Sequence, residues 1–336
     1  MRLVLLFLLL FVSLEADRII KVASYNVDNL FDLVKNGSEY EEYIPYTASQ
    51  WSEKTYATKL KNLAKVIAEI DADIIALQEV ESLKALKDLR SAIKQAGVYY
   101  EHYFIADRKD TTIKVALLSK LKPTYTKELF VTHTRKYRNI LEVKFSFKND
   151  SLYLFVNHWN SKYNAESSRI ISAKSLKERI KEIGEDKNII ILGDLNSHYE
   201  EHIKFTRDRK LNDTYGKTAI NHTLNTTEQT TKASQTSYKK GSLYNLWYDT
   251  KEDERYSYIY RGNKEVLDNI IISQSLLDKK YIYYIDGTMS SFKKPYLFKG
   301  KALNRWQISY GKVRVHKNSG YSDHLPIEAK FMIKEY

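Results

Sequence analysis

Apolar runs of strand length alternate with amphipathic stretches along the chain, and this alternation constrains the fold more than any other feature. The runs predicted to be strands span residues 19–25, 73–77, 113–118, 140–147, 152–157, 188–192, 267–272 and 327–333. Apolar residues recur at helical spacing over residues 56–70, 82–95 and 166–183. Gly97 and Gly184 lie just past two of these segments, as expected at helix ends. Interleaved strands and helices predict an α/β or α+β layered fold.

The chain carries few residues that would form a linker between domains. Its 336 residues include four prolines and eleven glycines, and no stretch has the composition of a flexible hinge. We therefore expect residues 17–336 to form a single domain with a sizeable core. The stretch Lys217 to Gly241, rich in Thr, Asn, Gln, Ser and Lys, is predicted to be a long surface loop or an ordered insertion.

The first sixteen residues have the pattern of a secretory signal. Arg2 precedes an uninterrupted apolar run from Leu3 to Val12, and the segment ends in the small residue Ala16. The run is too short to span a bilayer, which takes about 20 apolar residues. We predict a signal peptide over residues 1–16 and a secreted or periplasmic mature chain. The alternative is a buried N-terminal strand.

Charge and cysteine content narrow the function. Cysteine is absent, which excludes thiolate metal sites, cysteine nucleophiles and disulfides. The formal net charge is +12, and removal of residues 1–16 leaves it unchanged because Arg2 and Glu15 leave together. Such a surplus favours a polyanionic partner such as nucleic acid. A generally basic proteome is the alternative explanation.

Polar side chains follow several of the apolar runs at the point where each run ends. They occupy residues 24–28, 78–81, 157–160 and 193–196, and Ser322-Asp323-His324 lies near the end of the chain. Layered α/β folds place their sites just past such strands, where the sheet edge opens into a crevice. Carboxylates with few histidines suit Mg²⁺ or Mn²⁺ rather than zinc. Any one cluster alone is also compatible with an ordinary turn.

The order of these clusters resembles the endonuclease/exonuclease/phosphatase superfamily. The series is Tyr25-Asn26-Val27-Asp28, Leu77-Gln78-Glu79-Val80, Asn157-His158-Trp159-Asn160-Ser161-Lys162, Gly193-Asp194-Leu195-Asn196, Leu267-Asp268-Asn269-Ile270 and Ser322-Asp323-His324-Leu325-Pro326-Ile327. It spans residues 22–333 and looks most similar to deoxyribonuclease I-like bacterial extracellular nucleases. The resemblance implies a four-layer sandwich, in which two mixed β-sheets pack face to face with helices on the outside.

The resemblance also implies a site for Mg²⁺ or Mn²⁺. Glu79 matches the principal metal-binding glutamate of the superfamily, and Asn26 matches the asparagine beside the metal. Asp323 matches a further metal-associated carboxylate. Asp28 stands where some members place another acidic ligand.

Five further residues match catalytic positions of the superfamily. Asp194 matches the aspartate that activates or positions the attacking water, and Asn196 matches the residue that orients the phosphate. Asp268 matches the aspartate that orients the last histidine, which is His324. His158 matches the second catalytic histidine, the candidate acid for the leaving group.

Other polar residues have no supporting motif. Glu142, on the preceding predicted strand, is a candidate to orient His158. The basic run Arg135-Lys136-Tyr137-Arg138 fits phosphate contacts and a solvated loop equally well. Most of the 27 tyrosines are predicted to be core or half-buried, although some could stack on bases. Solvated loop positions are predicted for most of the remaining histidines, which are His102, His133, His198, His202, His222 and His316.

Together these features predict a secreted, monomeric, Mg²⁺-dependent nuclease that cleaves DNA or RNA by in-line attack of water. A sphingomyelinase-type phospholipid phosphodiesterase and a phosphate-monoester phosphatase of the same superfamily are alternatives, as is an inactive nucleic-acid-binding protein. Residues 281–306 are aromatic, but lysines and arginines interrupt them, which argues against a membrane wedge. The intact acid, base and metal positions argue against an inactive scaffold.

The predicted signal peptide can be tested by deletion. Removal of residues 1–16 should retain the protein in the cytoplasm, because the apolar run is the export signal. Mass spectrometry of the exported full-length product should find an N-terminus at or near Asp17. An exported chain that still carries the apolar run would show that this segment is an anchor.

Overall fold

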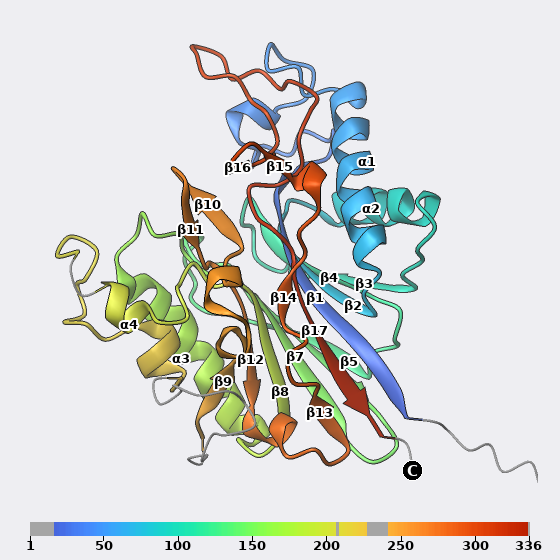
Figure 1. Cartoon of the computed structure of the whole chain (residues 1–336). Helices are drawn as coiled ribbons and strands as arrows, with labels where there is room; N and C mark the ends of the chain where they lie inside the picture. The colour runs from blue at the N-terminus through green and yellow to red at the C-terminus, as the bar shows by residue number, and fades with distance from the viewer. Residues whose placement is uncertain (1–16, 206–207, 227–240, 335–336) are drawn as a thin grey trace, which may run out of the picture.

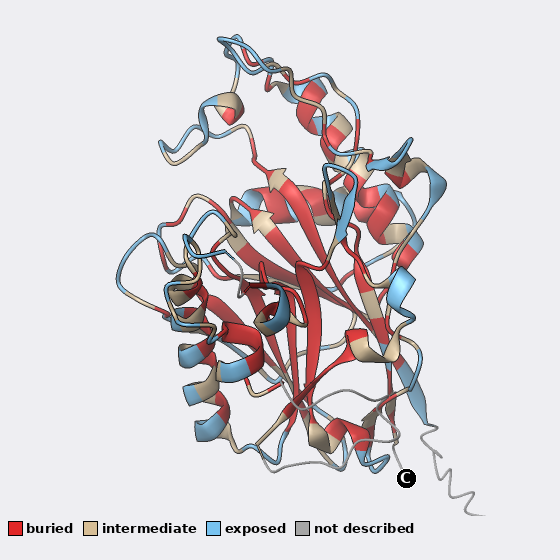
Figure 2. Ribbon diagram, turned by 60° about the vertical axis from the view of Figure 1, so that its left-hand side comes forward, coloured by how far each residue is buried: buried red, intermediate tan, exposed pale blue. Residues whose placement is uncertain are grey.

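Two mixed β-sheets pack face to face with helices on their outer faces (Figure 1). The computed structural model describes residues 17–205, 208–226 and 241–334. Buried strands occupy the centre of the molecule, and the outward faces of the helices are exposed (Figure 2). This arrangement confirms the predicted four-layer sandwich and its two mixed sheets.

The first sheet has seven strands, ordered β13-β17-β1-β2-β4-β3 with β14 also paired to β17. β1 and β2 are parallel, and every other pair in this sheet is antiparallel. The strands are β1 (Arg18–Leu30), β2 (Ile74–Val80), β3 (His102–Ile105), β4 (Lys114–Ser119), β13 (Ile282–Tyr284), β14 (Ser290–Ser291) and β17 (Ile327–Ile333). Helix α1 (Glu53–Ile70) connects β1 to β2, and α2 (Leu83–Gln95) follows β2.

The second sheet repeats this plan with six strands, ordered β5-β6-β7-β8-β12-β9. β7 and β8 form its one parallel pair, and α3 (Glu166–Ile183) connects them. The strands are β5 (Tyr125–Leu129), β6 (Ile140–Ser146), β7 (Ser151–His158), β8 (Asn188–Asp194), β9 (Leu243–Asn245) and β12 (Asp268–Ser273). Each sheet therefore has one central parallel pair whose carboxyl ends lie together.

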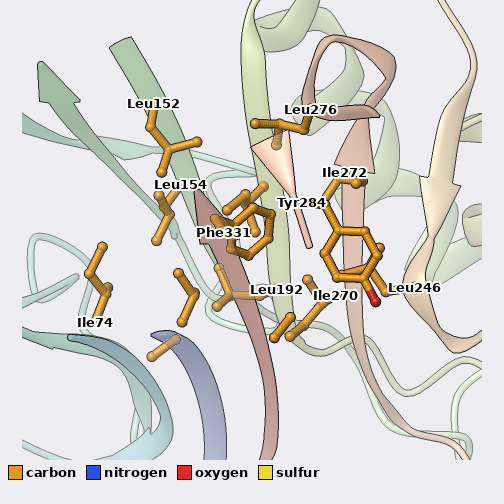
Figure 3. Close-up of a cluster of buried hydrophobic side chains, with 14 of the residues drawn as sticks. Ile74, Leu152, Leu154, Leu192, Leu246, Ile270, Ile272, Leu276, Tyr284 and Phe331 are labelled. Carbon is orange, nitrogen blue, oxygen red and sulfur yellow. The ribbon is translucent and has the colours of Figure 1, made fainter. Parts of the chain in front are cut away.

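Three apolar clusters hold the layers together. The central cluster fills the space between the sheets and includes Ile74, Leu154, Leu192, Ile270 and Phe331 (Figure 3). A second cluster lies between the first sheet and helices α1 and α2, and a third lies between the second sheet and α3. Burial on both faces explains why the central strands are almost continuously apolar in sequence.

The remaining elements are short. Two hairpins, β10–β11 (Tyr258–Tyr260, Asn263–Glu265) and β15–β16 (Phe298–Lys299, Ala302–Leu303), lie next to each other at one end of the molecule (Figure 1). Helix α4 spans Glu201–Lys204. Single turns of 3₁₀-helix occur at Glu41–Tyr43, Leu246–Asp249, Glu252–Glu254, Gln274–Leu277 and Pro295–Leu297. No helix in the described ranges is long and apolar enough to cross a bilayer.

The described part of the polar stretch 217–241 is an ordered insertion. Its first residues form a π-helical turn (Ala219–Thr223) that packs against α3. Glu166, fully buried in α3, accepts a hydrogen bond from the Ala219 amide at 2.8 Å. Thr218 and Asn221 are buried beside it, so a surface loop is the wrong description of residues 217–226. Residues 227–240 lie outside the described ranges.

Gly193 is required where β8 passes β7. Its φ of +131° is a conformation that other residues rarely adopt, and a Cβ there would lie 2.0 Å from the Asn157 carbonyl oxygen. We expect Gly193→Ala to lower the free energy of unfolding by at least about 3 kcal/mol, because the parallel pair must separate. Urea titration measures the change.

Gly311→Ala is the matched control. The nearest atom to a Cβ at Gly311 is 3.7 Å away, so its stability should change by less than about 0.5 kcal/mol. Equal stability of the two variants would show that the close approach of β7 and β8 is not a constraint.

Candidate active site

The polar clusters predicted from the sequence meet where the carboxyl ends of the two parallel pairs adjoin. Asn26 of β1 lies opposite Gln78 of β2, and His158 of β7 lies opposite Asp194 of β8. Asp268, at the start of β12, pairs with Asp194 across an antiparallel ladder. Segments almost 300 residues apart in the chain therefore contribute to one site, as the hydrogen bond from Ser322 Oγ to the Asn26 carbonyl shows.

The backbone at the strand ends is strained. Asp28, Asn29, Glu79 and Asn196 have φ angles of +50°, +62°, +67° and +48°, which non-glycine residues seldom adopt. The β1–β2 register shifts between Asn26 and Leu30, and the β2–β4 register shifts beside Glu79. Such bulges redirect side chains at about 1–3 kcal/mol for each strained residue. Here they bring the Asn29 amide within 2.9 Å of Glu79 Oε2, to which it donates a hydrogen bond.

Asn26 links the two halves of the site. Its side-chain nitrogen donates to Glu79 Oε1 and to Asp194 Oδ2, both at 3.1 Å. Its side-chain oxygen accepts from the Asp28 amide at 3.0 Å. The amide thus holds a carboxylate of the first sheet beside a carboxylate of the second sheet. Burial raises the pKa of Asp194 to about 6, although the His324 charge acts in the opposite direction.

His324 and Asp268 form a buried pair. His324 Nδ1 lies 2.7 Å from Asp268 Oδ2, and His324 Nε2 lies 3.9 Å from Asp194 Oδ2. Burial by itself lowers the pKa of His324, but the charge of Asp268 and the hydrogen bond to it outweigh that effect. The pKa therefore lies well above the usual value, and the ring is charged at neutral pH. Tyr258 packs against His324, with 5.0 Å between the centres of the two rings.

His158 also lies close to Asp194. Its Nε2 atom is 3.5 Å from Asp194 Oδ2 and 3.8 Å from Glu79 Oε1. Burial, followed by the charges of Arg138 and His324, lowers the pKa of His158 well below the usual value. The ring is therefore neutral in the free protein, unlike that of His324.

Glu142 does not orient His158. Its carboxylate accepts hydrogen bonds from Arg179 Nε at 2.8 Å and from Tyr125 Oη at 2.5 Å. Glu142 lies opposite Phe155, whose side chain packs under α3, whereas the residues on either side of Glu142 face the central core. The side-chain alternation of β6 thus directs Glu142 away from the site. In the described ranges, His158 Nδ1 has no hydrogen-bond partner.

A second pair of carboxylates, Asp28 and Asp323, lies beside Glu79. Arg305 Nη2 lies 3.3 Å from Asp323 Oδ2 and 3.7 Å from Asp28 Oδ1. Beneath them Lys59, fully buried in α1, donates to the Asp28 carbonyl at 3.0 Å and to the Tyr321 carbonyl at 3.1 Å. Lys59 thereby joins the end of β1 to the segment that carries Asp323 and His324. Neither Lys59 nor Arg305 lies in one of the motifs found in the sequence.

Arg138 is a site residue that the sequence left undecided. It lies within electrostatic range of Glu79 and Asp194, and burial lowers its pKa. Arg135, three residues earlier, instead pairs at 2.5 Å with Asp110 on the surface. The basic run therefore divides into a site residue and an exposed part, which its residue types alone could not reveal.

Asn196 supports the loop after β8. Its amide donates to Asp194 Oδ1 at 2.9 Å, and its side-chain nitrogen donates to the Trp159 carbonyl at 3.1 Å. The remaining histidines do not join the site. His198 and His316 are buried, contrary to the expected solvated loops, and Trp306 Nε1 donates to His316 Nδ1 at 2.8 Å. His133 and His222 are exposed as predicted.

The donor set fits one hard divalent cation that keeps several waters. In the described ranges no three His, Asp or Glu side chains converge tightly enough to form a complete cage. Mg²⁺ needs no such cage, because it binds through one or two carboxylates and retains water ligands. Burial, and then the charges of Asp28 and Asp323, raise the pKa of Glu79 to about 7. A carboxylate with this surplus of neighbouring negative charge favours a bound cation.

Comparison with known proteins agrees with this geometry. A sequence model described as Endonuclease/Exonuclease/phosphatase family matches residues 21–333. No curated protein sequence matches the chain significantly.

Solved structures share the fold at low sequence identity. A humanized D. rerio TDP2 with 14 mutations is 18% identical, with a TM-score of 0.56 over 93% of this chain and 98% of that chain. An endonuclease/exonuclease/phosphatase family protein from Bacteroides thetaiotaomicron is 16% identical, with a TM-score of 0.54 over 95% and 99%. D. rerio TDP2 complexed with a single strand DNA product is 17% identical, with a TM-score of 0.55 over 93% and 98%.

The raised pKa of Glu79 predicts a pH effect on stability. The folded pKa of about 7 exceeds the ordinary value of 4.5, so the folded state binds more protons between these values. Glu79 therefore destabilises the metal-free protein increasingly as pH rises, by up to roughly 3 kcal/mol. Glu79→Gln should flatten the decline in unfolding free energy between about pH 5 and pH 7, measured by urea titration in EDTA.

Glu265→Gln is the control for this measurement. Glu265 is a half-buried glutamate of β11 whose carboxylate forms no hydrogen bond or ion pair with a described residue of the site. Its pH profile should follow that of the wild type. If Glu79→Gln also retains the wild-type pH slope, the carboxylate cluster does not carry the repulsion described above.

Proposed function

The chain belongs to the endonuclease/exonuclease/phosphatase family, and on that premise we propose that it is a secreted, divalent-metal-dependent nuclease. Its substrate is DNA, with RNA as the other candidate, and its reaction is hydrolysis of phosphodiester bonds by in-line attack of water. The observation that carries the proposal is one buried site with a charged histidine, a neutral histidine and two carboxylates linked by Asn26.

Glu79 would hold Mg²⁺ or Mn²⁺, with Asn26 and Asp323 alongside. The ion supplies positive charge for the negative charge that develops on the phosphate in the transition state. Among the protein groups, Asp194 is placed to orient or deprotonate the attacking water. Its Oδ2 atom lies 3.5 Å from His158 Nε2 and 3.9 Å from His324 Nε2. Asn196 keeps that carboxylate in position through its backbone amide.

The two histidines have different roles because their charges differ. His324 is kept charged by Asp268 and directs Nε2 toward Asp194, so it can donate to a non-bridging phosphate oxygen. His158 is neutral in the free protein. An anionic phosphate in the site favours its charged form, so His158 takes up a proton with substrate and gives it to the leaving oxygen.

Three observations support nucleic acid as the substrate. The net charge of +12 favours a polyanion, and Arg138 and Arg305 place positive charge at the site itself. A protein of the same fold, D. rerio TDP2, has been solved with a single strand DNA product.

The apolar N-terminal segment supports secretion, and it lies outside the described residues.

The test is hydrolysis by the mature chain with Mg²⁺ and with EDTA, on plasmid DNA, RNA and sphingomyelin vesicles. Nucleic acid should be cleaved and the reaction should stop in EDTA, because the donor set consists of oxygens. His158→Ala and His324→Ala should each lower kcat by at least about 100-fold. His133→Ala is the matched control, since His133 is exposed and forms no hydrogen bond or ion pair with a described residue of the site.

Three results would count against this proposal. Hydrolysis of sphingomyelin with intact DNA and RNA would assign the enzyme to lipids. Full activity after metal removal would refute the metal-assisted mechanism. Normal turnover of His158→Ala would remove that residue from the catalytic set.

A further inference from the structure

Three tyrosine rings near the site are exposed although a tyrosine ring is largely apolar. The exposed fractions are 91% for Tyr163, 90% for Tyr310 and 48% for Tyr260. Each ring lies on a separate loop or hairpin tip beside residues of the site. We call these three residues the tyrosine rim.

Tyr163 is presented by a rigid turn. It follows His158 by five residues, in a turn closed by the hydrogen bond from the Asn164 amide to the Ser161 carbonyl. Fully buried Arg169 donates to the Asn160, Ser161 and Asn164 carbonyls at 3.2, 3.0 and 3.3 Å. The fixed backbone and the exposed ring together make a platform with little conformational entropy to lose.

Tyr260 lies on the same face of β10 as Tyr258, which contacts His324. Tyr258 packs against His324, and Tyr163 lies close enough to influence the pKa of Tyr258. Because residues two apart in a strand face the same side, Tyr260 faces the site about 7 Å farther out than Tyr258. Arg261, at the tip of the β10–β11 hairpin, lies 5.3 Å from the centre of the Tyr260 ring.

Tyr310 lies at the start of another closed loop. Ile308 and His316 form an antiparallel bridge at its base. The Ser309 amide donates to the Val315 carbonyl at 2.9 Å, and the Val315 amide donates to Ser309 Oγ at 3.1 Å. Tyr310 comes directly after this clamp and within electrostatic range of Arg305, the arginine that bridges Asp28 and Asp323.

We propose that the tyrosine rim binds unpaired bases by stacking, so that the enzyme acts preferentially on single-stranded nucleic acid. Arg305 pairs with Asp28 and Asp323 within electrostatic range of Tyr310, so it can contact a phosphate while the rings receive the bases. In a duplex the bases stack on one another and their faces are not available. Single strands, frayed ends and looped-out bases expose those faces. The inference rests on the proposed nuclease function.

Binding of a single-stranded oligonucleotide to metal-free Glu79→Gln protein, followed by fluorescence anisotropy, tests the rim. Tyr163→Ala and Tyr310→Ala, added to that variant, should each weaken binding by at least about fivefold. Tyr163→Phe and Tyr310→Phe should bind as before, because they keep the ring. The salt dependence of binding should not change in the alanine variants, since no phosphate contact is lost.

Tyr281→Ala is the matched control. Tyr281 is 44% exposed, comparable to Tyr260, but it adjoins β13 at the opposite end of the sheets from the β10–β11 hairpin (Figure 1). Its replacement should leave affinity unchanged.

The wild type with Mg²⁺ should show a higher kcat/KM on a single strand than on a duplex of the same sequence. The double variant Tyr163→Ala, Tyr310→Ala should lower the ratio of the single-strand kcat/KM to the duplex kcat/KM.

Two failures are distinguishable. If nucleic acid is cleaved but the alanine variants bind single strands as tightly as the parent, the rim proposal is wrong and the nuclease assignment stands. If the wild type cleaves no nucleic acid and the Glu79→Gln protein binds none, both proposals fall together.

Discussion

The hydrogen bonds of one amide, that of Asn26, connect the two halves of the site. Its nitrogen lies 3.1 Å from a carboxylate at the end of β2 and 3.1 Å from a carboxylate at the end of β8. Those distances require the two sheets to keep a fixed separation, which the central apolar cluster provides. A shift of the sheets by one ångström would separate Glu79 from Asp194 and the neutral histidine from the charged one. Packing in the core therefore determines geometry at the site.

The residues of the site lower the stability of the folded protein. Four non-glycine residues adopt left-handed backbone conformations, and Asp28, Glu79 and Asp323 gather negative charge in a buried volume. Cations in the surrounding structure offset these costs, because Lys59 is buried beneath the end of β1 and Arg305 bridges Asp28 and Asp323. A bound divalent ion and an anionic substrate would complete the charge balance. The folded protein therefore tolerates the strained backbone and the clustered charge, and the site keeps the charges needed to bind a divalent ion and an anionic substrate.

Sequence patterns predicted the central strands and the residues at their ends because burial on both faces produces continuous apolar runs. Asn26, Glu79, His158, Asp194, Asp268 and His324 all lie at the ends of such runs or in a motif, and the structure brings them together. Seven strands of two or three residues are too short to show any periodicity, namely β9, β10, β11, β13, β14, β15 and β16. Lys59 lies in no motif, and the basic run around Arg138 fits a solvated loop as well as phosphate contacts, because tertiary contacts alone place these two cations beside the carboxylates. Glu142 was misassigned because strand alternation turned it toward α3.

A phosphorothioate substrate tests most directly the proposal that this site cleaves phosphodiesters with a divalent metal held at Glu79. One non-bridging oxygen of a single scissile linkage is replaced by sulfur, and each stereoisomer is assayed with Mg²⁺ and with Mn²⁺. Because Mg²⁺ binds sulfur poorly and Mn²⁺ tolerates it better, one isomer should be cleaved slowly with Mg²⁺ and recover with Mn²⁺. Equal cleavage of both isomers with either metal, or cleavage that persists in EDTA, would contradict the account.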